Sequence, residues 1–227
     1  MPERCTPRKD PDLKKIHLSV LIPLILMTLL SLLCLFPAGI GGQKLQPASI
    51  ALIIGIAAFF LTRKTNDGKN PDRPTVWSWL KDRNCLTLMF MPLCMNVISL
   101  LTATFFVPEF IAHLKARTGF LSFHMIPVLV IELVIAALGE EIAWRAFFQK
   151  QLCKIVPFWP AVMVSSALFA ICHFNQGSAA VVVYDLVFIW INAIIYGVIF
   201  RKTDHALLSA AAHFLANLFG TVAILYL

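Results

Sequence analysis

The stretch Leu18–Phe36, with the sequence LSVLIPLILMTLLSLLCLF, indicates the fold class because it runs for 19 residues without a charge. A transmembrane helix needs about 20 mostly apolar residues. The stretch follows a basic segment, as the apolar part of a signal peptide does. It is longer than the roughly 7 to 15 residues of such a part, and it lacks a clear cleavage site. We therefore expect it to cross a membrane.

Comparable apolar runs recur along the 227 residues, of which 59% are hydrophobic and 14% charged. Ordinary soluble domains carry about 25% charged residues. The sequence predicts an all-α, polytopic membrane helical bundle of about seven transmembrane helices around an intramembrane polar cavity. The expected spans are approximately 17–38, 45–62, 86–107, 124–147, 157–175, 179–200 and 206–227. They form a single membrane domain, 17–227, with a motif-bearing core at about 124–220, after a basic cytoplasmic tail, 1–16.

The basic residues predict the orientation of these spans. The chain has 19 Lys and Arg against 12 Asp and Glu, a formal net charge of +7. With seven spans, every basic residue except Lys44, Lys115 and Arg117 falls on the side of the N-terminus. Because Lys and Arg accumulate in cytoplasmic loops, the N-terminus is predicted to be cytoplasmic. The expected partner of this charge is the lipid bilayer, and no nucleic acid partner is expected.

Six cysteines are scattered along the chain without a CxxC pair or a metal-finger spacing. Most of them lie inside apolar runs, where a free cysteine behaves as a small hydrophobic residue. We expect them to pack as such, at Cys5, Cys34, Cys85, Cys94, Cys153 and Cys172.

Ionisable side chains within spans are costly, about 2.5 to 3.5 kcal/mol each on insertion scales, so each marks a candidate functional site. Glu140 and Glu141 interrupt the fourth predicted span, His173 lies in the fifth, and His213 lies in the last. At 1.5 Å per residue, the predicted distances of these residues from the inner ends of their helices overlap loosely. We expect Glu140, His173, His213 and Asn217 to converge on one polar pocket.

Residue spacing refines this expectation, because residues four apart share a helix face. Phe169 with His173, and His213 with Asn217, are two such pairs. Glu141 and Arg145 form a third pair, which is predicted to be a helix ion pair. Mutual neutralisation would leave Glu140 as the free carboxylate.

Such a pocket suits hydrolysis, since a carboxylate can take a proton from water, imidazoles can orient the reacting groups and an amide can stabilise an oxyanion. Glu140, His173 and His213 are also a ligand set for Zn²⁺. We favour a water-activating carboxylate that requires no cofactor and keep the zinc site as the alternative. No HExxH sequence is present, which argues against zincin-type metalloproteases.

Asp185, within the sixth span, either supports the cavity or has a structural partner, and the sequence does not decide between the two. His17, His113, His124 and His205 lie at the ends of the predicted spans, so we expect these four histidines at the membrane interface.

The three segments match the patterns EExxxR, FxxxH and HxxxN, in that order, at Glu140, Glu141 and Arg145, at Phe169 and His173, and at His213 and Asn217. This arrangement resembles the CAAX-protease and bacteriocin-processing family (CPBP or ABI) of intramembrane glutamate proteases. The resemblance covers roughly residues 124 to 220.

The resemblance implies roles for these residues. Glu140 would activate water, His173 would help to bind it, and His213 with Asn217 would form the oxyanion side, supported by Glu141, Arg145 and Phe169. Substrates in the family are prenylated CaaX proteins or membrane-associated peptides. The short loops resemble bacterial members, which implies a bacterial inner membrane. Two other functions remain open: a catalytically silent membrane protein that confers immunity or regulates a partner, and a small proton-coupled transporter.

Overall fold

The computed structural model describes residues 17–36, 39–40, 43–44, 46–63, 74–119, 121 and 125–226. The predicted tail 1–16, most of the polar connection before residue 74, and His124 lie outside the described residues. Cys5 lies outside them as well.

Each predicted span corresponds to a helix. The helices are α1 (Leu18–Leu33), α2 (Pro47–Arg63), α4 (Arg83–Phe106), α6 (Ile126–Glu141), α8 (Phe158–Ile171), α9 (Ala179–Thr203) and α10 (Ala206–Tyr226). Short helices α3 (Val76–Leu80) and α5 (Phe110–Arg117) flank α4, and the strands β1 (Gly39–Ile40) and β2 (Gln43–Lys44) pair antiparallel between α1 and α2. The sequence predicted none of these four short elements.

Within the described chain, α4, α9 and α10 are long and apolar enough to cross a membrane. The shorter apolar helices α1, α2 and α8 have 16, 17 and 14 residues. The all-helical membrane character of the fold is therefore confirmed, whereas the count of seven crossings stays a prediction.

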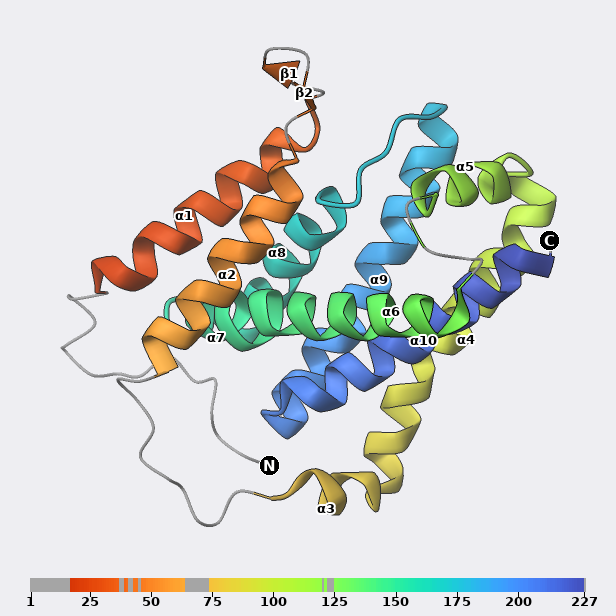
Figure 1. Ribbon diagram of the computed structural model, residues 1–227. Coiled ribbons are helices and arrows are strands. Elements are labelled where there is room, and N and C mark those ends of the chain that lie inside the picture. The colour runs from red at the N-terminus through yellow and green to blue at the C-terminus, as the bar shows by residue number, and fades with distance from the viewer. Residues whose placement is uncertain are drawn as a thin grey trace.

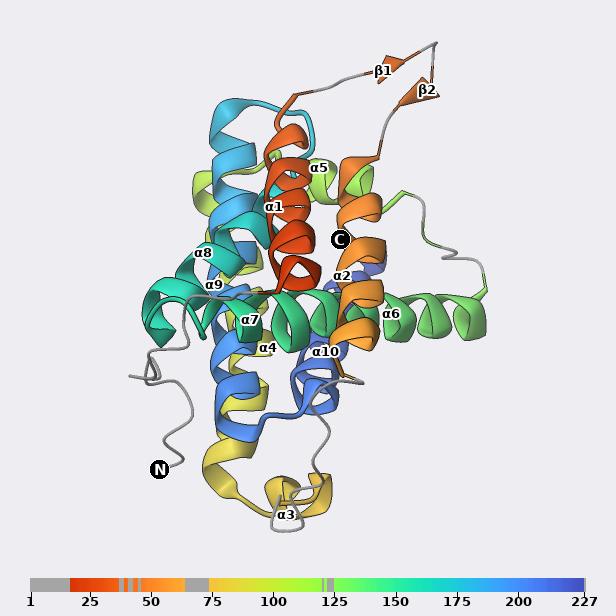
Figure 2. The ribbon, with the colours of Figure 1, turned by 90° about the vertical axis from the view of Figure 1, so that its left-hand side faces the viewer.

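The fourth predicted span differs most from expectation. The helix continues without a break from α6 through a π-helix, η2 (Ile142–Gln149), into α7 (Lys150–Leu152). This long element runs across the direction of α1, α2 and α9 in both views (Figures 1 and 2). Because a π-helix has a wider turn than an α-helix, side chains beyond the first turn of η2 are displaced from the positions that α-helical spacing predicts. Seven of the eight η2 residues are buried.

η2 packs closely against its neighbours. A Cβ at Gly55 of α2 would lie 2.7 Å from the Ala143 Cβ, and a Cβ at Gly197 of α9 would lie 2.6 Å from the Gln149 Oε1. Glycine at both positions allows α2 and α9 to approach η2. The Gln149 amide donates a hydrogen bond of 3.0 Å to the Gly197 carbonyl.

Large apolar side chains cover the outside of the bundle. Phe105 of α4 is 82% exposed, Ile126 of α6 71% and Leu18 of α1 67%, and many others are similar. Monomeric soluble proteins rarely expose contiguous apolar surface on this scale. The outer surface is suited to lipid.

A polar chain crosses the bundle interior between three helices. Asn192 of α9 donates to Asn96 of α4 at 2.8 Å, and Asn96 donates to the Ala216 carbonyl of α10, also at 2.8 Å. Amide side chains commonly join membrane helices in this way. These bonds hold α10 against α4 and α9, next to the helical turn that carries His213.

Candidate active site

Glu141 and Arg145 form the buried ion pair that their spacing predicts. Arg145 Nε lies 3.5 Å from Glu141 Oε2, and both side chains are 0% exposed. Arg145 Nη2 also donates to the Ala193 carbonyl of α9 at 3.2 Å. The start of η2 is thereby tied to α9, at the point where α6 ends.

Glu141 has a second partner that the sequence did not predict. Its Oε1 lies 3.1 Å from His213 Nδ1 of α10. Glu141 therefore does more than neutralise Arg145, since it also orients the His213 ring. Helical spacing could not reveal this contact because it joins residues on two different helices.

Glu140 lies between two imidazoles. Its Oε1 is 4.0 Å from His173 Nε2 and its Oε2 is 3.7 Å from His213 Nε2. The Glu140 side chain is 22% exposed, in contrast to the fully buried Glu141. The structure thus brings Glu140, His173 and His213 together, with Glu140 as the accessible carboxylate.

The hydrogen bonds made by the Nδ1 atoms define the tautomers of the two histidines. His173 Nδ1 lies 2.9 Å from the Phe169 carbonyl, which can only accept, so Nδ1 donates. By the same reasoning, His213 Nδ1 donates to the Glu141 carboxylate. In their neutral forms both rings therefore turn an Nε2 lone pair towards Glu140.

Phe169 of α8 packs at the centre of this cluster. Its ring centroid lies 4.6 Å from the His173 ring and 6.0 Å from the His213 ring. The Arg145 guanidinium lies 4.8 Å from the Phe169 centroid, within the range of a cation–π contact. Phe169 thus fixes the positions of both imidazoles and of Arg145 through one buried ring.

Tyr196 of α9 is a site residue that the sequence analysis missed. Its ring stacks on His213 with centroids 4.5 Å apart and an interplanar angle of 16°. Tyr196 is 2% exposed. An isolated tyrosine in an apolar helix gives no sequence signal of this kind, because the contact depends on how α9 and α10 pack.

Asn217 lies one turn beyond His213 on α10 and is half-buried. Within the described part of the chain its side-chain amide has no hydrogen-bond partner. Asn217 shares a helix with His213, but no contact joins it to Glu140. Its predicted role on the oxyanion side stays a prediction.

A cavity of about 120 Å³ opens onto this cluster. Residues of α2, of the α6–η2 junction and of α8 line it: Ala48, Ser49, Leu52, Glu140, Trp144, Phe169, Cys172 and His173. The α2 part of the wall was not predicted, since α2 carries no ionisable residue in this region. The cavity thus combines the ionisable side chains of Glu140 and His173 with mostly apolar walls from α2 and α8.

Glu140, His173 and His213 would be the ligands of the alternative zinc site. Zinc bonds to nitrogen and oxygen are about 2.0 to 2.2 Å long. Among the described residues, no group of three or more His, Cys, Asp or Glu side chains has an arrangement that could hold a metal ion. The metal-free site and the zinc alternative both stay predictions.

Asp185 lies away from this cluster and has a structural partner. Its Oδ2 is 3.3 Å from His113 Nε2 and 3.5 Å from Arg117 Nε, both of α5. The His113 ring is 8% exposed, so it faces Asp185 and not the surroundings of the bundle, and its position at the membrane interface stays a prediction. The Asp185 carboxylate provides a polar partner for the buried His113 ring and for Arg117, and these contacts hold α5 on α9.

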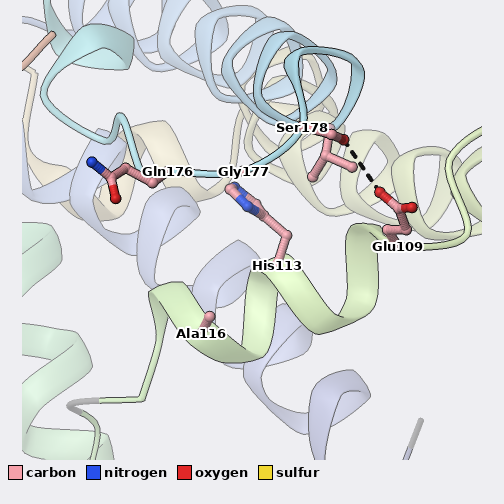
Figure 3. Close-up of a pocket in the computed structure, with 7 residues that line it drawn as sticks. Glu109, His113, Ala116, Gln176, Gly177 and Ser178 are labelled. Carbon is pink, nitrogen blue, oxygen red and sulfur yellow. Dashed lines mark hydrogen bonds between the residues drawn. The ribbon is translucent and has the colours of Figure 1, made fainter.

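A second cavity, of about 210 Å³, lies beside this contact (Figure 3). Its wall combines α5 with the start of α9, where the Ser178 hydroxyl donates to Glu109 Oε2 at 3.2 Å. None of the three motifs contributes a residue to it. Of the motif residues, Glu140, Phe169 and His173 line the smaller cavity.

The fold and site define a helical membrane protein with a buried carboxylate–imidazole cluster. The family model of type II CAAX prenyl endopeptidase Rce1-like proteins matches residues 122–219. The resemblance of these motifs to the CAAX-protease family is thus confirmed over that segment, and it supports a CAAX-type intramembrane protease. No curated protein and no solved structure gives a significant match.

Proposed function

We propose that the protein is an intramembrane endopeptidase in which Glu140 activates a water molecule. The observation that carries this proposal is the position of Glu140, whose two carboxylate oxygens face His173 Nε2 and His213 Nε2 at 4.0 and 3.7 Å. Glu141 is already paired with Arg145. Glu140 is thus the carboxylate of the pair that remains available for chemistry.

The spacing of these groups suits a bridging water. Distances of 3.7 and 4.0 Å are longer than a direct hydrogen bond, so a water between the groups is the natural partner. Such a water donates one hydrogen to Glu140 and the other to the Nε2 of His173. Its oxygen lone pair then points away from both acceptors, towards a peptide carbonyl in the cavity.

The proton balance follows from this arrangement. Glu140 takes the water proton as the oxygen attacks the carbonyl carbon, and it returns that proton to the leaving amine as the C–N bond breaks. The Asn217 amide, which has no partner within the described chain, supplies a donor for the developing oxyanion on the His213 side. No metal or other cofactor enters this scheme.

The surroundings of the site favour a membrane-associated substrate. Apolar walls from α2 and α8 line the cavity, and exposed apolar side chains cover the outer helices. A peptide carrying a prenyl group or an apolar segment can lie along such surfaces from the lipid side. We place the chain in a bacterial inner membrane with seven crossings and a cytoplasmic N-terminus, as its charge distribution predicts.

The test compares peptide termini in membranes that contain the wild-type protein, E140Q or E109Q at matched abundance. Glu109 is exposed and belongs to the other cavity, so E109Q is the same chemical change away from the site. New termini with wild type and E109Q, but not with E140Q, would support the protease and identify its substrate.

Identical termini in all three membranes would contradict hydrolysis. If E140Q also kept the cellular phenotype, a binding or regulatory protein would account for the data. Proton flux into reconstituted vesicles that E140Q abolishes would instead indicate a transporter.

A further inference from the structure

Two cysteines lie at equivalent places on neighbouring helices. Cys34 is the C-terminal cap of α1 and Cys172 is the C-terminal cap of α8. Both are half-buried, whereas Cys85 and Cys153 are buried and Cys94 is exposed. The sequence analysis treated all six cysteines as packing residues and did not anticipate this pairing.

The two thiols contact the same turn of α1. Cys172 Sγ donates to the Ser31 hydroxyl at 3.3 Å, and Cys34 Sγ donates to the Leu30 carbonyl at 3.4 Å. Ser31 and Cys34 are three residues apart on α1 and therefore lie on neighbouring positions of the same helix face, so both thiols lie at the last turn of α1. Packing between the ends of α1 and α8 has therefore brought together two thiols that are distant in sequence.

We propose that Cys34 and Cys172 are a disulfide site that links the end of α1 to the end of α8. A disulfide needs Cβ atoms about 3.5 to 4.5 Å apart, and rotation about the Cα–Cβ bonds then turns the two sulfur atoms towards each other. The shared turn of α1 brings the two thiols into the same region of the bundle. Both cysteines cap their helices, so neither has to distort a helix interior. The proposal concerns this covalent link and does not depend on peptide hydrolysis at the neighbouring site.

The predicted orientation places the pair in an oxidising environment. If the basic N-terminal segment is cytoplasmic, α1 begins at the cytoplasmic face, and its Cys34 end lies at the opposite face. The Ser31–Cys172 hydrogen bond places the end of α8 at the same level. Disulfides form and persist on the external side of the bacterial inner membrane and are rare in the cytosol.

The oxidant is a small-molecule or protein disulfide, written RSSR. The thiolate of one cysteine attacks RSSR, which forms a mixed disulfide and releases one RSH after protonation. The second thiol then attacks the protein sulfur of that mixed disulfide, forms the Cys34–Cys172 bond and releases the second RSH. Two protein thiols are oxidised, and one RSSR is reduced to two RSH.

The link would act on a wall of the candidate active site. Cys172 lines the 120 Å³ cavity together with Glu140, and His173 follows it directly in sequence. Fixing Cys172 to α1 restrains the end of α8 from which His173 reaches towards Glu140. The disulfide is thus expected to limit how far this wall can move away from α2.

The test uses membranes that contain the wild-type protein, C34S, C172S or C94S. The membranes are incubated with oxidised glutathione, free thiols are trapped with N-ethylmaleimide, and non-reduced digests are analysed by mass spectrometry. C94S is the matched control because it removes an exposed cysteine outside the pair. Wild type and C94S are expected to give a Cys34–Cys172 linked peptide and to lose two trapped thiols per chain.

C34S and C172S are expected to give no linked peptide, and the link in wild type is expected to disappear after reduction. Cys34 and Cys172 that both carry N-ethylmaleimide or glutathione in oxidised wild-type membranes would overturn the proposal. Because the readout is a peptide mass, a failure here is distinguishable from a failure of the proposed protease activity.

Discussion

Tyr196 stacks on His213 with ring centroids 4.5 Å apart and planes inclined by 16°, which covers one face of an imidazole that also contacts both glutamates. Polar atoms contact the edge of the ring: Nδ1 lies 3.1 Å from Glu141 Oε1, and Nε2 lies 3.7 Å from Glu140 Oε2. His213 is thereby held in one orientation by a ring stack and by the Glu141 hydrogen bond.

This stack leads to the first prediction. Y196F keeps the aromatic ring and should retain most of the peptidase activity, whereas Y196A removes the ring and opens a cavity. Loss of a large buried aromatic side chain lowers the free energy of unfolding by about 3 to 5 kcal/mol. Because His213 also loses the ring that fixes its orientation, kcat should fall as well. Thermal unfolding and peptide cleavage by the two variants provide the check. Equal loss of activity in Y196F would point to the hydroxyl and contradict a positioning role of the ring.

The two adjacent glutamates should respond differently to the same substitution. E140Q should lower kcat by roughly 10² to 10⁴-fold with little change in stability, because it removes a general base at an accessible position. E141Q should destabilise the fold by about 3 to 5 kcal/mol, because it leaves the buried Arg145 charge without its partner. Unfolding midpoints and single-turnover cleavage separate the two effects. A stable E141Q protein would argue against the buried ion pair.

The Asp185 contact predicts a local effect on α5. D185N removes the charge that faces His113 and Arg117, and we expect a loss of about 1 to 3 kcal/mol because Arg117 is partly exposed. Loosening of α5 should let its backbone open at Lys115 and Arg117, so that trypsin cleaves there faster. Digestion of wild type and D185N in the same detergent, followed by peptide mapping, tests this expectation. An unchanged cleavage pattern would show that α5 is held by its apolar contacts alone.

The Asp82–Lys202 pair predicts a pH-dependent contribution to stability at the edge of the bundle. Lys202 Nζ lies 2.8 Å from Asp82 Oδ2, and this hydrogen bond holds the pKa of the Asp82 carboxyl below its usual range. A carboxyl with a lowered pKa in the folded state stabilises the fold above its unfolded pKa of about 3.9 and loses this effect as the pH falls further.

D82N is the variant that tests this pair, since Asn still caps the start of α4. Wild type should be more stable than D82N at pH 7, and the difference should shrink as the pH falls below about 3.9. Thermal unfolding at a series of pH values measures it. A difference that is constant with pH would exclude the ion pair as its cause.

Chelators test whether a metal takes part. A glutamate-activated water needs no metal, so 1,10-phenanthroline or EDTA should leave peptide cleavage unchanged. Inhibition that added Zn²⁺ reverses would contradict the metal-free mechanism and restore Glu140, His173 and His213 as ligands.

The sequence by itself determined the elements and the residues that carry chemistry. Mostly apolar runs located a helix within each of the seven predicted spans, because apolar length is a property of each segment alone. Spacing of four residues also predicted the Glu141–Arg145 pair correctly. The same local rule put His173 one turn after Phe169, and the two rings are in contact.

Only the tertiary structure decided the contacts between helices. Helical periodicity defines the face on which a side chain lies, but the neighbour of that face depends on crossing angles and on the register of packing. In the site, the crossing angle follows from the crosswise course of the α6–η2–α7 helix, and the packing register follows from its π-helical turn after Glu141. They bring Glu141 to His213, while packing of other helices brings Tyr196 to the same ring and Cys34 to Cys172. None of these contacts is encoded within one helix.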